Sequence, residues 1–270
     1  MYEEFFGLTA QPFSITPDPH YLFFSRRHRE AFEHMLFGIT QRKGFIQITG
    51  EVGAGKSTLC RAVLEQLREG FSTALILNPV MTGIQLVRTI LHEFGLDDHG
   101  NDRVQLVRRL NDFLLERLHA GQDVVLFVDE AQDMSDDLLE EIRLLSNLET
   151  DDRKLVQIVL VGQPELRRRL DQPELRQLRQ RITVRYHLGP IARAETEAYI
   201  FHRLTVAGSN GRPSFSPAAI RGIHRASRGV PRVINAICDK ALLAGYVEDC
   251  DYITRRQVRR AVRDLEGHPP

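Results

Sequence analysis

The sequence predicts an α/β domain with a parallel five-stranded sheet between two layers of helices, followed by a small all-helical domain. The first observation behind this prediction is that five short apolar runs alternate with segments of helical periodicity before residue 189. Such alternation is typical of parallel sheets whose strands are covered on both faces. The second observation is that helical periodicity continues alone after Gly189-Pro190. We therefore assign residues 1–189 to the α/β domain and residues 190–270 to the helical domain.

The apolar runs define the expected strands, and the periodic segments define the expected helices. The predicted strands are residues 45–49, 73–78, 124–128, 155–161 and 182–188. The predicted helices of the α/β domain are residues 27–42, 56–69, 82–95, 103–119, 136–147 and 172–180. Those of the helical domain are residues 192–206, 217–227, 231–246 and 254–266. Two of the latter begin with Ser216-Pro217 and Thr254, residue types that are common at helix starts.

The composition is that of a globular protein with no net charge. Charged residues make up 27% of the chain, and 36 Lys and Arg are balanced by 36 Asp and Glu. This balance excludes a global positive field that holds nucleic acid or an anionic membrane. The three cysteines form no C-x-x-C pair and have no histidines at metal spacing, and Cys60 and Cys238 lie in helical apolar patterns, which predicts that these two are buried reduced thiols. No apolar run approaches the roughly 18 residues of a membrane span and no signal peptide is evident, so we expect a cytoplasmic protein.

The segment Gly50-Glu51-Val52-Gly53-Ala54-Gly55-Lys56-Ser57 is a complete G-x-x-x-x-G-K-[ST] motif. It follows an apolar strand pattern and leads through Thr58 into a helical pattern, the context that a phosphate-binding loop requires. Glycines let backbone N–H groups turn toward phosphate oxygens, and the helix N-terminus adds partial positive charge. Lys56 is then placed to reach the β- and γ-phosphates and Ser57 to bind Mg²⁺. The motif predicts that residues 50–58 bind a nucleoside triphosphate.

Two carboxylates, Asp129 and Glu130, follow the apolar run at residues 124–128. In a nucleotide-binding α/β sheet, the ligand lies at the carboxyl ends of the strands. Asp129 is therefore predicted to hold Mg²⁺, and Glu130 to orient and deprotonate the attacking water. The alternative is that both are solvated carboxylates at the start of a loop.

Gln163 follows the run at residues 155–161 in the sequence Gly162-Gln163-Pro164. If this strand lies between the strands of the glycine motif and of the two carboxylates, Gln163 is predicted to lie beside the γ-phosphate. Its polar side chain then reports whether that phosphate is present. The alternative is a loop glutamine that precedes a proline.

Four arginines are further candidates for catalysis. Arg176, Arg179 and Arg181 lie on a helix that runs into the strand at residues 182–188. A helix at that edge points away from its own phosphate loop, so these arginines are predicted to act in a neighbouring subunit's site, as arginine fingers. Arg232, in Gly229-Val230-Pro231-Arg232, opens a helix and is predicted to bridge the helical domain to the γ-phosphate. The alternative for the first three is a solvated basic face, and for Arg232 it is a surface arginine in a turn.

Together these motifs resemble the AAA+ ATPases, which are P-loop NTPases with a three-layer αβα core and a helical lid. Within that resemblance, Gly50 to Ser57 form the Walker A motif, Val124 to Glu130 form Walker B, and Gly229 to Arg232 form a second sensor motif. No Asn-Lys-x-Asp sequence, which reads guanine in GTPases, is present. The resemblance therefore implies ATP as the nucleotide.

The flanking segments are similar to the general secretion pathway protein A (ExeA/GspA-type) family. The shared sequences are Phe6-Gly7-Leu8, Gln11-Pro12-Phe13, Thr16-Pro17-Asp18-Pro19, Asp129-Glu130-Ala131-Gln132 and Gly162-Gln163-Pro164-Glu165-Leu166. The resemblance implies that residues 1–43 wrap the adenine end of the site, where Pro12 and Phe13 contact the base. An apolar clamp suits a purine face, and the alternative for these two residues is core packing.

The resemblance implies an ATP-hydrolysing oligomer that couples turnover to assembly or export of a secretion, exopolysaccharide or pilus system. It also implies recruitment to the inner membrane by a membrane protein partner. Longer members of the family add a membrane span and a peptidoglycan-binding domain. Because this sequence stops at Pro270, we expect either a short stand-alone member or the cytoplasmic part of a longer protein.

Two other functions are open from the sequence. One is a DNA-handling ATPase similar to transposition helper proteins, since the segment from Asp151 to His187 contains nine Lys and Arg but only five acidic residues. DNA binding is disfavoured by the preceding segment, Asp129 to Asp152, which contains ten acidic residues and a single basic one, Arg143. The other is a slow nucleotide-gated switch, against which the intact Glu130 argues. The acidic stretch and the arginines at residues 167–169 are also predicted to face each other between subunits of a head-to-tail oligomer.

Overall fold

The computed structural model of the chain divides into two compact units. The sheet unit comprises Glu30–Gly50 and Leu59–Leu188, and the helical unit comprises Met1–Arg29, Glu51–Thr58 and Gly189–Pro270. The chain enters the helical unit at Gly189, next to the expected start of the helical domain. The N-terminal segment and the loop at residues 51–58 also group with the helical unit, whereas the sequence analysis assigned both to the α/β domain.

The structure describes residues 1–16, 18–67, 70–97, 99, 102–150 and 153–267. Pro17, Asp151, Asp152, Pro270 and the last residues of the helix predicted at 56–69 therefore lie outside the described residues. Along the described part of the chain, no helix combines the length and the apolar character needed to cross a bilayer.

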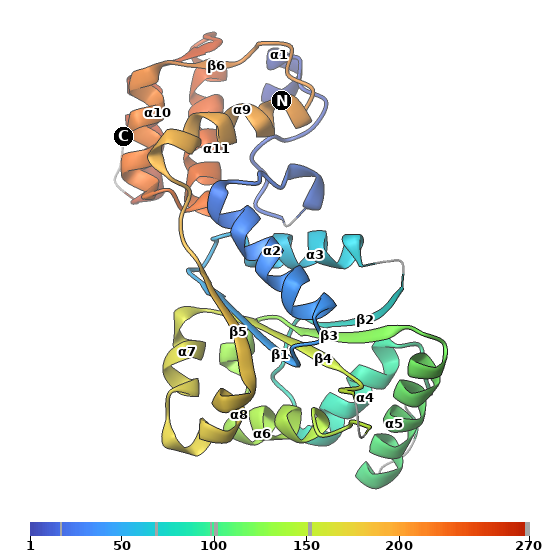
Figure 1. Ribbon diagram of the computed structural model, residues 1–270. Helices are drawn as coiled ribbons and strands as arrows, with labels where there is room; N and C mark the ends of the chain where they lie inside the picture. The colour runs from blue at the N-terminus through green and yellow to red at the C-terminus, as the bar shows by residue number, and fades with distance from the viewer. Residues whose placement is uncertain (17, 68–69, 98, 100–101, 151–152, 268–270) are drawn as a thin grey trace. The chain divides into compact units, whose positions relative to one another are not determined.

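The sheet unit is built on five parallel strands in the order β2-β3-β4-β1-β5 (Figure 1). These strands are β1 (Phe45–Gly50), β2 (Phe71–Ile76), β3 (Asp123–Val128), β4 (Gln157–Gly162) and β5 (Ile182–Leu188). This confirms the predicted five-stranded α/β fold. β2 begins two residues before the predicted strand, because Phe71 and Ser72 already pair with Asp123 and Val124 of β3.

Helices cover both faces of this sheet (Figure 1). On one face lie α2 (Arg26–Thr40) and α3 (Lys56–Gln66). On the other lie α4 (Gly83–Glu93), α5 (Arg103–His119), α6 (Asp136–Leu145), α7 (Pro164–Leu170) and α8 (Arg176–Arg181). α2 packs closely, because a Cβ on Gly38 would lie only 2.6 Å from the side chain of Ile46.

Two details of the helices differ from the sequence prediction. α7 was not predicted, because only Leu166 and Leu170 of its seven residues are buried, which is too few to produce a clear apolar period. The helix predicted at residues 172–180 is a 3-10 turn, Pro173–Leu175, followed by α8.

The core of the sheet unit explains why its three central strands, β3, β4 and β1, are nearly continuous apolar runs. Val124, Leu126 and Val128 of β3 join the hydrophobic cluster under α4 to α8, and successive strand residues alternate between the faces of a sheet. Val125 and Phe127 therefore face the other side, where they are also fully buried. Strands buried on both faces need apolar residues at every position.

The helical unit contains α9 (Thr196–Val206), α10 (Pro217–Ser227), α11 (Pro231–Val247) and α12 (Arg255–Leu265). These match the four helices predicted after residue 190. The short helix α1 (Tyr2–Phe6) and two two-residue strands, β6 (Ser214–Phe215) and β7 (Tyr252–Ile253), were not predicted. Such short elements carry too few residues for a period to be read from sequence.

Arg203 of α9 binds the N-terminal segment to the helical unit. Its guanidinium donates hydrogen bonds to the backbone oxygens of Pro12 at 2.5 Å and Ser14 at 3.2 Å. It also lies 4.6 Å from the centre of the Tyr21 ring, a cation–π distance. The residue is 7% exposed, so these contacts are shielded from water. Together with Tyr2, Phe6, Leu8 and Phe13, which are buried in the hydrophobic cluster of the helical unit, they account for the grouping of residues 1–29 with the helices.

Replacing this arginine tests that account. We expect Arg203→Ala to lower the free energy of unfolding by about 2–4 kcal/mol, because it removes the donor to the buried Pro12 oxygen, one of two donors to the Ser14 oxygen, and a packed side chain. Urea denaturation followed by circular dichroism measures the loss. Arg221→Ala, an exposed arginine of α10, is the matched control and should stay within about 0.5 kcal/mol of the wild type. Equal stability of both variants would contradict the role given to Arg203.

Candidate nucleotide-binding site

Three of the predicted site residues lie at one edge of the sheet. Gly50 ends β1, Asp129 follows β3, and Gln163 follows β4. The strands are parallel, and β4 pairs with β1 on one side and with β3 on the other. β4 therefore lies between the other two, which is the arrangement on which the prediction for Gln163 depended. The carboxyl edge of a parallel sheet is where nucleotides bind in α/β proteins.

Asp129 and Glu130 differ in exposure and in backbone conformation. Asp129 is 3% exposed, and its Oδ1 accepts a hydrogen bond from the backbone N–H of Glu130 at 2.9 Å. Glu130 is half-buried and has a left-handed backbone with φ 50°. This conformation is uncommon for residues other than glycine, costs energy and concentrates at functional sites. The two carboxylates therefore have different surroundings, which suits two different roles.

Two glutamines hold the Glu130 carboxylate in place. Gln132 Nε2 donates to Glu130 Oε2 at 2.8 Å, and Gln163 Nε2 approaches the same oxygen at 3.4 Å. Gln132 Oε1 in turn accepts from the backbone N–H of Gln163 at 2.9 Å. Gly162 makes room for this contact, since a Cβ there would lie 2.8 Å from Gln132 Oε1. Gln132 thus links the ends of β3 and β4.

Arg169 of α7 supports the same turn from outside the sheet. It donates to the backbone oxygen of Gln132 at 2.8 Å and to that of Met134, and it pairs with Asp136. Its neighbour Arg168 pairs with Glu165 at 3.2 Å. Two of the three arginines at residues 167–169 are therefore engaged within the protein. This weakens the case that they form a DNA-binding patch.

The loop at residues 51–58 has the backbone of a phosphate cradle. Gly53 and Gly55 have φ of 76° and 96°, values that other residues rarely adopt. The Lys56 ammonium donates to the backbone oxygen of Glu51 at 3.1 Å, and Lys56 is 5% exposed. Lys56 is also the first residue of α3, so the N–H groups of that helix start at the loop.

His28 braces this loop and was not predicted from the sequence. Its Nε2 lies 2.9 Å from the backbone oxygen of Ala54, and its Nδ1 lies 2.7 Å from the Ser25 hydroxyl. Because a carbonyl only accepts, Nε2 carries the proton and the Ser25 hydroxyl donates to Nδ1. Burial lowers the pKa of the His28 imidazole, which keeps it neutral. No motif marks this residue, which lies 22 residues before Gly50 in the chain.

Arg232 lies against the glycine loop, as the prediction for it requires. Its backbone N–H donates to the oxygen of Gly53 at 3.2 Å. A Cβ on Gly53 would lie 2.4 Å from the Arg232 Cβ, so only glycine fits there. Gly229 is constrained in the same way, with φ 79° and the Ile191 oxygen 2.1 Å from an added Cβ. The start of α11 is therefore fitted to the phosphate loop.

The three finger candidates have different surroundings on α8. Arg181 donates to the Ser146 hydroxyl at 2.6 Å, and Arg179 pairs with Asp171 at 3.4 Å. Arg176 is exposed, and no partner is recorded for it among the described residues. The backbone oxygen of Arg179 also accepts from Arg185 at 2.6 Å. The predicted role of these arginines in a neighbouring site stays a prediction.

Pro12 and Phe13 lie in the helical unit. The Pro12 oxygen accepts from Arg203, and the Phe13 ring is 2% exposed in the hydrophobic cluster of that unit. Its centre lies 6.5 Å from that of Phe215, in an edge-to-face arrangement. These contacts are those of the core-packing alternative, and contact with adenine stays a prediction.

The residues present fit a magnesium ion that comes with its nucleotide. No group of three or more His, Cys, Asp or Glu side chains that could hold a metal alone occurs among the described residues. Mg²⁺ in nucleotide sites is bound by one or two protein oxygens together with phosphate oxygens. The buried Asp129 carboxylate and the Ser57 hydroxyl are oxygen donors of this kind.

The chain is similar to known proteins in sequence and in fold. A family profile described as AAA domain matches residues 39–170. General secretion pathway protein A of Aeromonas hydrophila is 46% identical over 268 residues, which cover 99% of this chain and 49% of that protein. The chain thus spans about half the length of the curated relative it matches.

Solved structures share the fold at low sequence identity. The Aeropyrum pernix ORC2 protein, in ADPNP-ADP complexes, has a TM-score of 0.70 and 17% identity, over 93% of this chain and 71% of that chain. The Thermotoga maritima RuvB Holliday junction branch migration motor has a TM-score of 0.59 and 18% identity, over 89% of this chain and 69% of that chain. At these identities the likeness shows the fold alone.

Because His28 is neutral when buried, we expect the stability of the protein to depend on pH. Because its pKa is lower in the folded than in the unfolded protein, the unfolded chain takes up a proton first as the pH falls. The stability that His28 contributes is therefore present above its ordinary pKa of about 6.5 and is lost below it. We expect the stability advantage of the wild type over His28→Gln to shrink from pH 7.5 to pH 5.5, by at most about 1.4 kcal/mol per pH unit.

Urea denaturation of both proteins at several pH values measures the difference between their free energies of unfolding. The contributions of the other titrating groups are common to both proteins and cancel in this difference. A constant advantage across the range, or one that grows on acidification, would contradict a buried neutral His28.

Proposed function

The chain belongs to the AAA-domain proteins related to general secretion pathway protein A, and from that premise we propose that it binds ATP with Mg²⁺ and hydrolyses it. The observation that carries the proposal is the shared edge of the sheet, where the start of the glycine motif, the two carboxylates and Gln163 leave three neighbouring strands. Few functions other than nucleotide turnover need this set of groups together.

The phosphate loop has the role of holding the triphosphate. The backbone N–H groups of residues 50–58 surround the phosphates, and Lys56 exchanges its bond to the Glu51 oxygen for the β- and γ-phosphates. Ser57 and Asp129 are the residues that would hold the Mg²⁺ ion, and the ion would supply positive charge to neutralise charge that develops on the phosphate oxygens.

Glu130 has the role of general base. The attacking water places its oxygen in line with the γ-phosphorus and gives a proton to Glu130, while the bond from that phosphorus to the oxygen of ADP breaks. The bonds from Gln132 and Gln163 both reach Oε2, and no donor to Oε1 is recorded within the described part of the chain. Oε1 is therefore the oxygen that we assign to the water.

The remaining groups respond to the γ-phosphate. Gln163 shares the Glu130 carboxylate, so a change in its amide contacts alters how the base is held. Arg232 packs on Gly53 at the start of α11, so we assign its guanidinium to bridging the helices to the γ-phosphate. Arg179 and Arg181 complete the site of a neighbouring copy in an oligomer. Pro12 and Phe13 contact the adenine in the site of their own chain.

The work that hydrolysis drives is proposed from the relative alone. The name of that protein places it in general secretion, and this chain covers about half of it. We propose that ATP turnover is coupled to assembly or export of an envelope system. A membrane protein partner recruits the cytoplasmic ATPase to the inner membrane.

Two variants separate binding from chemistry. We expect Lys56→Ala to weaken ATP binding at least about tenfold, because the charge that faces the phosphates is lost. We expect Glu130→Gln to bind ATP normally and to hydrolyse it about 10²-fold or more slowly, because the amide cannot accept the proton. Phosphate release and anisotropy of a fluorescent ATP measure the two effects. Arg108→Ala, exposed on α5, is the control. Wild-type turnover by Glu130→Gln would contradict the assignment of the base.

A mixing experiment tests whether the arginines act between copies. We expect Arg179→Ala/Arg181→Ala to turn over ATP about 10³-fold or more slowly, as finger variants do. An equal mixture with Glu130→Gln should recover activity, at most about a quarter of the wild-type rate, since one interface in four joins an intact base to an intact finger. No recovery in a mixture that sedimentation shows to be assembled would contradict action in trans.

A further inference from the structure

α12 carries five arginines that divide into two sets on the helix surface. Arg256 and Arg260 are four residues apart and share one side, and the other three, Arg255, Arg259 and Arg263, also repeat every four residues and share another. The chain from residue 189 onward contains thirteen Lys and Arg but only eight Asp and Glu. The helical region is therefore basic in an otherwise neutral protein.

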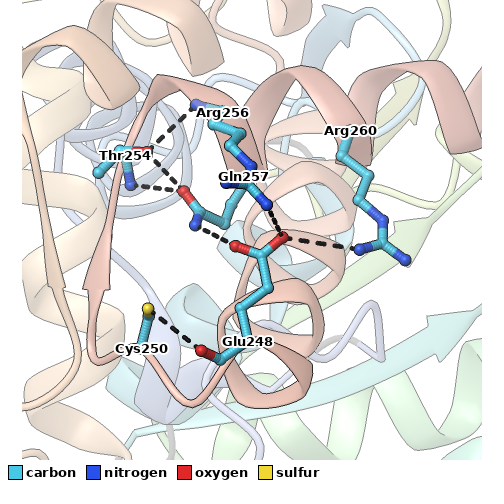
Figure 2. Close-up of polar contacts among 6 residues, drawn as sticks. All are labelled: Glu248, Cys250, Thr254, Arg256, Gln257 and Arg260. Carbon is cyan, nitrogen blue, oxygen red and sulfur yellow. Dashed lines mark hydrogen bonds and ion pairs between the residues drawn. The ribbon is translucent and has the colours of Figure 1, made fainter.

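The two arginines of the first set share one acidic partner, Glu248, within the protein (Figure 2). Glu248, which follows α11, accepts from Arg256 at 3.2 Å and from Gln257 at 2.7 Å, and pairs with Arg260 at 3.7 Å. Gln257 also bonds Thr254 at the start of α12. Arg256 and Arg260 thus help to join α12 to the end of α11, and this side of the helix has a structural role.

The second set lines a groove between α10 and α12. Arg255, Arg259 and Arg263 stand on one side and Arg225 of α10 stands on the other, around a volume of about 490 Å³. All four are exposed. No acidic partner is recorded for any of them over the residues that the structure describes. Four like charges repel one another, so this arrangement is stabilised by a ligand that brings negative charge.

The floor of the groove is apolar. It is formed by Gly222 and Ala226 of α10 and by Val258 and Val262 of α12. Gly222 keeps the floor open, because it has no side chain and Val258 lies 3.4 Å from where a Cβ would stand. A ligand that fills the groove therefore carries apolar groups as well as negative charges.

We propose that this groove binds an acidic amphipathic helix of a partner protein. Residues four apart on a helix are separated by about 6 Å along its axis, so Arg255, Arg259 and Arg263 match carboxylates spaced i, i+4 and i+8 on a partner helix. Arginine pairs with carboxylates through two parallel hydrogen bonds. Leucine-sized side chains on the adjoining stripe of that helix cover the floor, as in other helix-in-groove interfaces.

This occupant fits the groove better than the other anionic partners. A nucleic acid backbone presents phosphates but no apolar ridge to cover Ala226, Val258 and Val262. A membrane surface meets the arginines at the rim but does not enter a concave floor. All the groove residues belong to the helical unit, so the inference does not depend on the nucleotide site.

The test uses the full chain and a synthetic peptide of about 16 residues with Glu at i, i+4 and i+8 and Leu on the adjoining stripe. A second peptide replaces each Leu by Ser. Fluorescence anisotropy near physiological salt should show at least about tenfold tighter binding of the first peptide. Arg255→Glu/Arg259→Glu should weaken that binding at least about tenfold.

Two further variants separate docking in the groove from general attraction. Ala226→Phe fills the groove without a change in charge and should weaken binding of the first peptide to a similar extent. Arg221→Glu makes one such Arg-to-Glu change on α10, at an exposed residue that does not line the groove, and should bind the first peptide normally. Thermal melting and ATP turnover, measured in parallel, separate a loss of fold or of nucleotide activity from a loss of the groove.

Several outcomes would overturn the proposal. They are an absence of peptide binding, equal affinity for both peptides, and wild-type affinity in Arg255→Glu/Arg259→Glu or in Ala226→Phe. Tighter binding of a 20-base-pair duplex, or of vesicles rich in anionic phospholipid, would assign the groove to one of those partners instead.

Discussion

The parallel order of the sheet is the constraint on which the rest of the candidate site depends. Because β4 separates β1 from β3, the carboxyl ends of three neighbouring strands deliver a glycine, an acid and an amide to one edge. Gly50 is held there by close packing, since a Cβ would lie 2.7 Å from the Leu188 oxygen of β5. The strands are buried on both faces, so this edge is supported by the whole core of the sheet unit.

The phosphate loop is supported differently, by side chains of the helical unit. His28 binds the Ala54 oxygen, and Arg232 binds and covers Gly53. Each glycine of the loop thus satisfies two demands, a left-handed backbone and the space for a neighbour. The start of α11 is therefore in direct contact with the loop.

The sequence predicted the parts of the site that depend on local pattern. The glycine motif, the acids after β3 and the four helices after residue 190 each follow from a contiguous segment. The sequence did not predict the supporting roles of His28, Gln132 and Arg203, because these roles depend on partners far along the chain or on a neighbouring strand. α7 was not predicted because its apolar period is too short. The grouping of residues 1–29 with the helices depends on contacts of Arg203 and on burial of N-terminal apolar residues among the helices, which no local pattern reveals.

The central claim is that the loop after β1 and the acid after β3 hold one Mg²⁺-nucleotide together. Calorimetric titration with ATP, in Mg²⁺ and in EDTA, tests it on the wild type and on Asp129→Asn. The account predicts that Mg²⁺ raises the affinity of the wild type at least about tenfold and that Asp129→Asn loses this gain. An absence of ATP binding, or an unchanged magnesium effect in the variant, would contradict it.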